Sequence, residues 1–293
     1  MSVKRLLRLS NWRVRVVVGL FLAGLFAIQC TRTEAFRENS SMTVINGQIV
    51  GENSPALLKK VDQLAKTDHV ALLELCLENY RQKYHDFTCT FAKQEVLRGE
   101  NKPEQVIQVK HLANPFSVAM TWVKNAPLGD KVLYVEGKYN NQMLVRPTSS
   151  LARMIVPVAV RQPDGEEAMK NTLRPVNLFG FGRGMQSLLD IYRLAASNGD
   201  LRIEFGGYGK TNNSDKRTVV QLIRYLPNKP EYHTAAAKTN IFIDIEHMVP
   251  LIIEGYDWEG RLTSRYEYSD VKFNVGLTDA DFTPSANGIK DPK

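Results

Sequence analysis

The chain of 293 residues carries 38 Lys and Arg against 31 Asp and Glu, but this excess of positive charge is concentrated at its start. Five of the basic residues precede Cys30, which leaves 33 against 31 in the rest of the chain. A nearly neutral body, without clusters of Lys and Arg among aromatic residues, excludes the usual kind of nucleic-acid-binding surface. The three cysteines form no Cys-x-x-Cys motif and no Cys/His spacing suited to zinc.

Residues 1–35 are typical of an export signal, because five basic residues without an acidic one precede the apolar run 16–28. That run is short for a bilayer span, so we expect a signal peptide, with an uncleaved N-terminal anchor as the alternative. Cleavage before Cys30 would attach a lipid to this cysteine, whereas Thr33-Glu34-Ala35 offers an ordinary cleavage site. Both alternatives predict an exported protein of the periplasm or cell envelope, held at a membrane where the anchor or the lipid is kept.

The polar stretch 36–53 is expected to be a flexible tether, and the folded domain is expected to begin at residue 54. Ser54-Pro55 has the pattern of a helix N-cap followed by proline in the first turn. Apolar residues at helical spacing then predict two helices, over 55–66 and 69–84.

From residue 86 the hydrophobic period changes to two, which predicts strands. Phe87, Cys89 and Phe91 alternate with smaller or polar residues, and the segment 116–122 places all of its large apolar residues on one side. Further strands are expected at 104–112, 131–136, 141–146, 201–206, 217–226, 239–246, 250–258 and 261–274. About ten strands joined by turn sequences predict an α+β, mostly β fold: a curled antiparallel meander, or open half-barrel, covered by helices.

Two cysteines lie close together in this part of the sequence. Cys76 falls in the second helix and Cys89 in the strand that follows it. In an oxidising compartment they are a candidate disulfide, and two buried free thiols are the alternative.

Residues 147–199 interrupt the succession of strands. Four prolines and many apolar residues between 147 and 183 predict either a lid or an ordinary insertion packed on the sheet. A helix is expected over 185–196. The single domain is expected to span 54–284, and 285–293 to be a disordered tail.

Residues suited to catalysis or metal binding form no recognisable pattern. The histidines are scattered, at His69, His85, His111, His233 and His247. Asp244 and Glu246 share one face of a predicted strand, where a solvated outer face explains them more simply than an acid/base pair. Asp279 and Asp281 lack the further oxygen ligands that calcium requires. We therefore expect no catalytic residue, no metal site and no cofactor.

Several strings of residues resemble an uncharacterised exported bacterial family, catalogued as domain of unknown function 1571, over about residues 70–284. These strings are Tyr80-x-x-x-Tyr84-x-Asp86-Phe87-Thr88-Cys89-Thr90-Phe91-x-Lys93-Gln94-Glu95, Pro115-Phe116-Ser117-Val118-x-Met120-x-Trp122, Val132-Leu133-Tyr134-Val135-Glu136-Gly137, Met143-Leu144-Val145-Arg146-Pro147, Tyr268-x-Asp270-Val271-x-Phe273-Asn274 and Leu277-Thr278-Asp279-x-Asp281-Phe282. This resemblance implies no established activity.

The order of helices followed by a meander is also similar, more distantly, to the lipoprotein-sorting carriers of the Lol type. That resemblance implies an open half-barrel, a helical lid and an apolar cavity for acyl chains. The expected partner is then a lipid or an acylated lipoprotein. The alternative is a structural or interaction module of the cell envelope whose barrel is filled by its own side chains.

For the lipid-binding hypothesis, large apolar residues on one side of the strands are the candidates for lining the cavity: Phe87, Phe91, Phe116, Val118, Met120, Trp122, Met143, Ile241, Ile243, Ile253 and Tyr266. Apolar residues of the insertion are the candidates for the lid: Met154, Ile155, Phe179, Phe181, Leu188 and Ile191.

Overall fold

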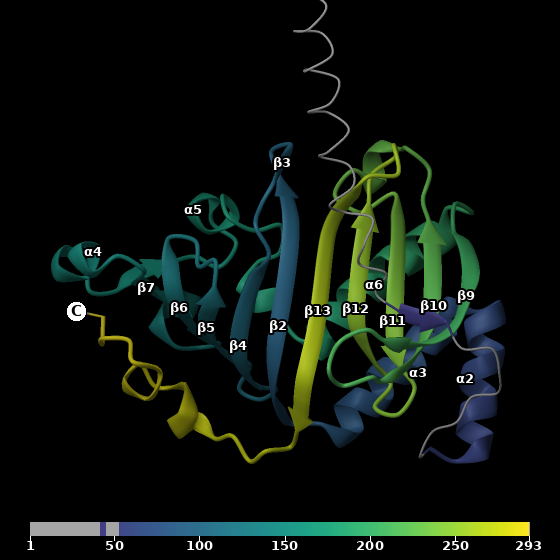
Figure 1. Ribbon diagram of the computed structural model, residues 1–293, viewed down its shortest axis with the longest axis horizontal. Coiled ribbons are helices and arrows are strands. Elements are labelled where there is room, and N and C mark those ends of the chain that lie inside the picture. Colours follow the sequence, from purple (N-terminus) through teal and green to yellow (C-terminus); the bar gives the residue numbers. More distant parts are fainter. Residues whose placement is uncertain (1–41, 45–52, 293) are drawn as a thin grey trace, which may run out of the picture. The chain divides into compact units, whose positions relative to one another are not determined.

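An open antiparallel sheet, covered on one face by helices, organises the part of the chain that the structure describes, residues 42–44 and 53–292 (Figure 1). This structure is a computed structural model. The expected signal peptide or anchor, and with it Cys30, lies outside the described residues, as do residues 45–52 of the expected tether. Among the described helices, none has the length and apolar character needed to cross a membrane.

Two meanders form the sheet. The first consists of β2 (Asp86–Leu97), β4 (Gln105–Leu112), β5 (Ser117–Lys124), β6 (Gly129–Val135), β7 (Met143–Pro147) and β8 (Ala159–Arg161), with the short β3 (Glu100–Asn101) paired to β2. The second consists of β9 (Arg202–Thr211), β10 (Thr218–Tyr225), β11 (Lys238–Asp244), β12 (Val249–Tyr256) and β13 (Leu262–Phe273). β13 pairs with β2 and joins the two meanders, so the predicted fold class is confirmed.

The free edge of β9 pairs with β1 (Met42–Val44), in which Met42 lies opposite Thr211. This strand corrects part of the sequence prediction, because residues 42–44 were expected to belong to a flexible tether. A polar segment forms a strand here since β9 offers it a row of unpaired backbone groups.

Strict alternation along β2 defines the two faces of the sheet. Phe87, Cys89 and Phe91 are buried, while the residues between them are only partly buried. The Phe87 ring lies 4.9 Å from that of Phe181 on α6 (Phe181–Ser197). We call the face that carries these side chains the inner face.

Three helices provide most of the cover for the inner face: α2 (Pro55–Thr67), α3 (His69–Lys83) and α6. The Ser54 side chain accepts a hydrogen bond from the backbone of Leu57, and Pro55 occupies the first turn, as predicted. In α6 the buried residues recur every three or four positions, so one stripe of the helix packs on the sheet: Phe181, Met185, Leu189, Tyr192 and Ala195.

The C-terminal residues form part of the fold, which corrects the expected disordered tail over 285–293. Residues Asp279–Phe282 and Ser285–Asn287 are short 3₁₀ helices, and Phe282 and Ile289 are buried in a second apolar cluster with Leu133 and Leu144. These last two alternate with inner-face residues of β6 and β7, so the cluster lies on the opposite, outer face. The Lys131 side chain donates a hydrogen bond to the carbonyl of Asn287 at 2.9 Å. No pattern within residues 285–293 indicates that the outer face here is apolar and requires a cover.

Ile289→Ala should lower the free energy of unfolding by about 2–5 kcal/mol, because it removes a buried side chain from the outer-face cluster. Urea denaturation measures this change. Lys290→Ala is the matched control, since Lys290 is exposed one residue further on. If both variants unfold at the wild-type urea concentration, the C-terminal residues contribute no packing.

Candidate functional site

The structure brings the cavity candidates together on the inner face. All eleven belong to the main apolar core or pack against it, with Trp122 and Ile253 partly buried and the others buried: Phe87, Phe91, Phe116, Val118, Met120, Trp122, Met143, Ile241, Ile243, Ile253 and Tyr266. Their common location follows from the registers of the strands. Met120, for example, lies opposite Val109 on one side and Val132 on the other.

The lid candidates divide into two groups. Phe179 and Phe181 are buried in the main core, Leu188 packs against it, and Ile191 packs against a small cluster around Tyr232. Met154 and Ile155 lie on α4 (Ser150–Ile155) and are exposed, so in this structure they do not cover the inner face. The sequence prediction placed both groups in the lid because their side chains are apolar. In the structure only Phe179, Phe181, Leu188 and Ile191 pack against an apolar surface.

Phe181 occupies the centre of the inner face. Its ring lies 4.9 Å from Phe87, 4.6 Å from Tyr268, 5.6 Å from Phe273 and 5.9 Å from Tyr80. These rings come from β2, β13 and α3, so one side chain at the start of α6 contacts three other elements.

Gly180 precedes Phe181 and has a backbone conformation that requires glycine. Its φ is +90°, and a Cβ atom placed there would lie 2.8 Å from Nε2 of His111. His111 lies on β4 with its ring stacked on Phe87 at 4.6 Å. The glycine therefore allows α6 to begin directly against the sheet.

Residues 159–180, which we call the cover segment, connect the sheet edge to α6. The segment includes β8, α5 (Glu166–Met169) and the 3₁₀ helix Val176–Leu178. It begins at the edge, where β8 pairs with β7, and Thr172 contacts β2. Since β4 to β7 lie between these two points in the sheet, the segment crosses them. Ala168 and Val176 pack against the main core.

A buried polar cluster fastens the middle of the cover segment. The Glu95 carboxylate accepts hydrogen bonds from the Tyr266 hydroxyl at 2.8 Å, the Leu173 backbone N–H at 3.1 Å and the Thr172 hydroxyl at 3.3 Å. Lys93 Nζ lies 3.2 Å from the other carboxylate oxygen. Burial, together with the Glu95 charge, holds the pKa of Tyr266 well above its usual range, so this phenol remains a donor at neutral pH.

A second attachment of the cover segment involves Arg183, in the first turn of α6. The Arg183 guanidinium donates to the carbonyl of Asn177 and to the Glu136 carboxylate, both at 2.8 Å. Its central carbon lies 3.6 Å from the centroid of the Phe116 ring, which is cation–π geometry. The cover segment is thus attached by polar contacts at two points.

The sequence prediction did not include the residues that attach the cover segment, although the sequence contains part of the pattern that places them. Lys93 and Glu95 continue the period-two pattern of Phe87, Cys89 and Phe91 and therefore point inward. Their partner Thr172 lies 77 residues from Glu95, and no local pattern indicates that distant contact.

Cys76 and Cys89 are free, buried thiols in the structure, so the candidate disulfide is not formed and the alternative interpretation applies. Both side chains are part of the main core. Burial raises the pKa of the Cys76 thiol to about 12, which makes it unreactive as a nucleophile.

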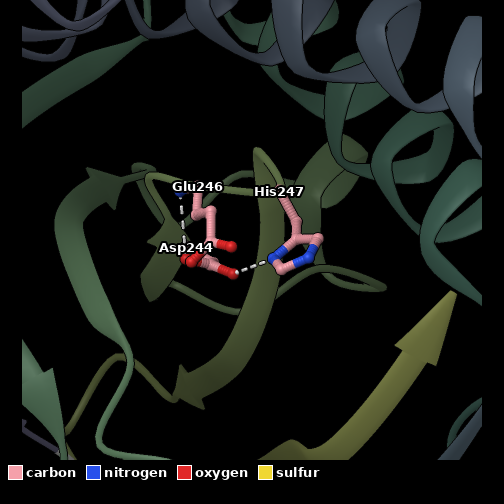
Figure 2. A group of neighbouring side chains, drawn as sticks. All are labelled: Asp244, Glu246 and His247. Atoms are coloured by element: carbon pink, nitrogen blue, oxygen red, sulfur yellow. Dashed lines mark hydrogen bonds and ion pairs between the residues drawn. The ribbon is translucent and has the colours of Figure 1, made fainter. Parts of the chain in front are cut away.

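A second cluster of polar residues lies at the turn between β11 and β12. One ligand atom each of Asp244, Glu246 and His247 lies within 4.8 Å of the others, a set that could bind a metal ion (Figure 2). A guanidinium nitrogen of Arg217 contacts all three, at 2.8 Å, 2.7 Å and 2.5 Å. A cation is therefore already bound among these groups, and the cluster is best described as an ion-pair network.

The Asp244 side chain is almost fully buried in this network. Burial acts to raise its pKa, but hydrogen bonds from His247 and Arg217 and the guanidinium charge outweigh it, so the pKa of Asp244 is lowered. The hydrogen bond from Asn79 to the carbonyl of His247 ties the same turn to α3. These contacts indicate a structural role for the cluster.

Arg217→Ala should cost about 3–5 kcal/mol of folding free energy at neutral pH, because it leaves the buried Asp244 carboxylate without its guanidinium partner. Urea denaturation measures the loss. Arg261→Ala is the matched control: Arg261 also pairs with two carboxylates but is exposed, and its removal should cost less than about 1 kcal/mol. A rise in the wild-type melting temperature on adding zinc would contradict the ion-pair interpretation.

Stability should fall as the pH drops below about 6.5, because His111 is buried uncharged. Burial and the nearby Arg183 lower its pKa to about 3. Between these values the unfolded chain binds a proton that the folded chain does not, which costs at most about 1.4 kcal/mol per pH unit. His111→Gln should therefore flatten the dependence of urea-unfolding free energy on pH. His233→Gln, at an exposed histidine, is the control and should leave the slope unchanged.

Comparison with solved structures gives matches of low identity. MucB matches at 12% identity and a TM-score of 0.45, covering 74% of this chain and 63% of MucB, so the chain spans less than two thirds of that protein. A putative outer membrane lipoprotein-sorting protein domain from Vibrio parahaemolyticus matches at 14% identity and a TM-score of 0.36, covering 73% and 97%. A LolA superfamily protein from Nitrosomonas europaea matches at 12% and 0.31, covering 73% and 98%.

No curated protein matches the sequence. A family profile does match, over residues 84–290, and this range contains most of the strings that carried the family resemblance. It covers both meanders, the cover segment and the C-terminal 3₁₀ helices. The chain belongs to the family described as Protein of unknown function (DUF1571).

Proposed function

We propose that this protein is an exported, non-catalytic binder of lipid or lipoprotein acyl chains, which it holds between the inner face of β4 to β7 and the cover segment. The N-terminal sequence supports export. The inner face of these strands carries mostly apolar side chains, two methionines among them, which supports an apolar ligand.

A difference in packing along the inner face carries this proposal. Phe87, which packs against Phe181 of α6, is 0% exposed, whereas Met120, Val132 and Met143 on β5, β6 and β7 are 7–8% exposed. Trp122 and Val145 on the same strands are only partly buried. Several side chains on the inner face of β5 to β7 therefore remain partly accessible beneath the cover segment.

The cover segment has the features of a movable element. Its own apolar residues Leu173 and Leu178 are exposed, so much of its apolar surface does not contribute to the core. Its polar attachments at Glu95 and Arg183 are few and local. Segments with few buried apolar contacts open at the lowest free-energy cost.

An acyl chain inserted under the cover segment would be stabilised by burial alone. Each methylene transferred from water contributes about 0.8 kcal/mol, so a groove that holds half of a fatty acid gives useful affinity. Met120 and Met143 are unbranched and flexible, which allows the surface to adapt to an inserted chain.

The alternative function is an interaction module of the cell envelope without a ligand. The full burial of Leu222, Ile241 and Ile243 favours it for β10 and β11. Trp122 lies on the inner face of β5, and its indole N–H donates a hydrogen bond to Gln105 at 2.7 Å. The lipid-binding function predicts that a ligand contacts the surface around Trp122, whereas the interaction module predicts that none does.

Dibrominated stearic acid should quench part of the tryptophan fluorescence of the wild-type protein, because bromine quenches only near contact and Trp122 lies on the proposed binding surface. Trp122→Phe should abolish this quenching while a fluorescent fatty acid still binds. Trp258→Phe should retain it, since Trp258 packs against the separate cluster around Tyr232.

Glu95→Gln provides a further arm of the same assay. This substitution weakens the charge-assisted hydrogen bonds that hold the cover segment. If opening of the cover segment limits the rate at which dibrominated stearic acid binds, that rate should rise about tenfold. Absence of quenching in the wild-type protein, or unchanged quenching in Trp122→Phe, would favour the filled interaction module.

A further inference from the structure

An exposed apolar patch lies at the connection between β7 and β8. Its members are side chains of α4, of the residue that follows it and of the neighbouring β5–β6 turn, here called the α4 patch: Leu128, Leu151, Met154, Ile155 and Val156. Met154, Ile155 and Leu128 are 77–82% exposed, and Leu151 is 67% exposed. Thr148, two residues before α4, donates a backbone hydrogen bond to the carbonyl of Leu128 at 3.0 Å, so the two segments are adjacent. Figure 1 shows α4 beyond β7, far from α2, α3 and α6.

The patch is presented by an ordered element. The Ser149 hydroxyl caps α4 by accepting a hydrogen bond from the Ala152 N–H. Arg146 forms two hydrogen bonds of 2.8 Å with the Asp130 carboxylate, and Arg153 on α4 contacts the same carboxylate at 3.4 Å. These contacts hold the helix against β6 while its apolar side chains face solvent. Contiguous exposed apolar surface of this kind marks an interaction site.

Positive charge predominates around the patch, with the Asp130 carboxylate pairing with Arg146 and Arg153. Residues 137–163 contain four basic side chains, at Lys138, Arg146, Arg153 and Arg161, and no Asp or Glu. Arg161 follows the patch on β8 and is exposed. Apolar side chains projecting from a rim of arginines match the boundary between anionic headgroups and acyl chains.

We propose that the α4 patch is a membrane-association site that inserts into the surface of a bilayer containing anionic lipids. Leu151, Met154, Ile155 and Val156 enter the headgroup–acyl boundary, and Arg153 and Arg161 contact lipid phosphates. The exposed Arg161 beside the patch favours an anionic lipid surface as its occupant. The site is separate from the inner face and does not depend on acyl-chain binding there.

Tryptophan reporters test this proposal in the full chain. In Ile155→Trp the introduced indole should be quenched, beyond the wild-type level, by vesicles of two parts brominated phosphatidylcholine to one part phosphatidylglycerol. Leu194→Trp is the matched control, because Leu194 is an exposed apolar residue on α6 and should gain no additional quenching. Quenching at a defined position reports insertion of α4 even if the N-terminal region also binds the vesicles.

Second substitutions in the Ile155→Trp protein test whether apolar insertion and electrostatic attraction both contribute to vesicle binding. Met154→Asp should reduce the additional quenching at least fivefold, and Arg161→Gln should weaken vesicle affinity about fivefold. Added salt should weaken binding to the anionic vesicles. Circular dichroism should show the wild-type fold for each variant, since the altered side chains are exposed. Equal quenching at positions 155 and 194, or none at position 155, would overturn the proposal and leave a protein partner as the explanation of the patch.

Discussion

The burial of Phe181 among four aromatic rings is the interaction on which the rest of the structure depends. Because the rings belong to α3, β2 and β13, the contact fixes α6 against the strand pair that joins the two meanders. Removing the Phe181 ring would leave a large void at that junction. The neighbouring Gly180 and His111 follow from the same constraint, since α6 can begin at this position only if no Cβ separates it from β4.

This anchoring divides the inner face into two regions with different cover. Toward β10 and β11, regular helices bury the sheet completely, and stability there follows from close packing. Over β4 to β7, the cover segment adds few apolar side chains to the core, and Glu95 and Arg183 hold it through polar contacts. If the cover segment opens as proposed, its hydrogen bonds can be exchanged for bonds to water while the close packing of the first region stays intact.

The sequence predicted the strands well, because alternation in segments such as 86–97 directly reports which side faces a core. The sequence prediction failed where contacts between residues that are distant in the sequence determine the structure. The helix that begins at Phe181 was expected to begin near residue 185, since the glycines at 180, 182 and 184 are poor helix formers. Two of them serve close approach: a Cβ at Gly180 would meet His111, and one at Gly182 would lie 3.1 Å from Tyr80. The lid prediction for Met154 and Ile155 failed because apolar character does not distinguish a buried surface from an interaction surface.

The insertion between β7 and α6 thus combines two kinds of apolar residue with opposite environments. Phe179 is buried against Phe91 at 5.1 Å, whereas Met154, in the same insertion, faces solvent from a capped and salt-bridged helix. A short helix that keeps its apolar side chains in water gains nothing from them in the folded monomer. In the proposed membrane-association site these side chains would be stabilised by leaving water for the headgroup–acyl boundary, and the arginines that flank them match an anionic surface. The fastening of the cover segment and the exposure of α4 are then two consequences of one insertion, one serving the inner face and the other serving contact outside the molecule.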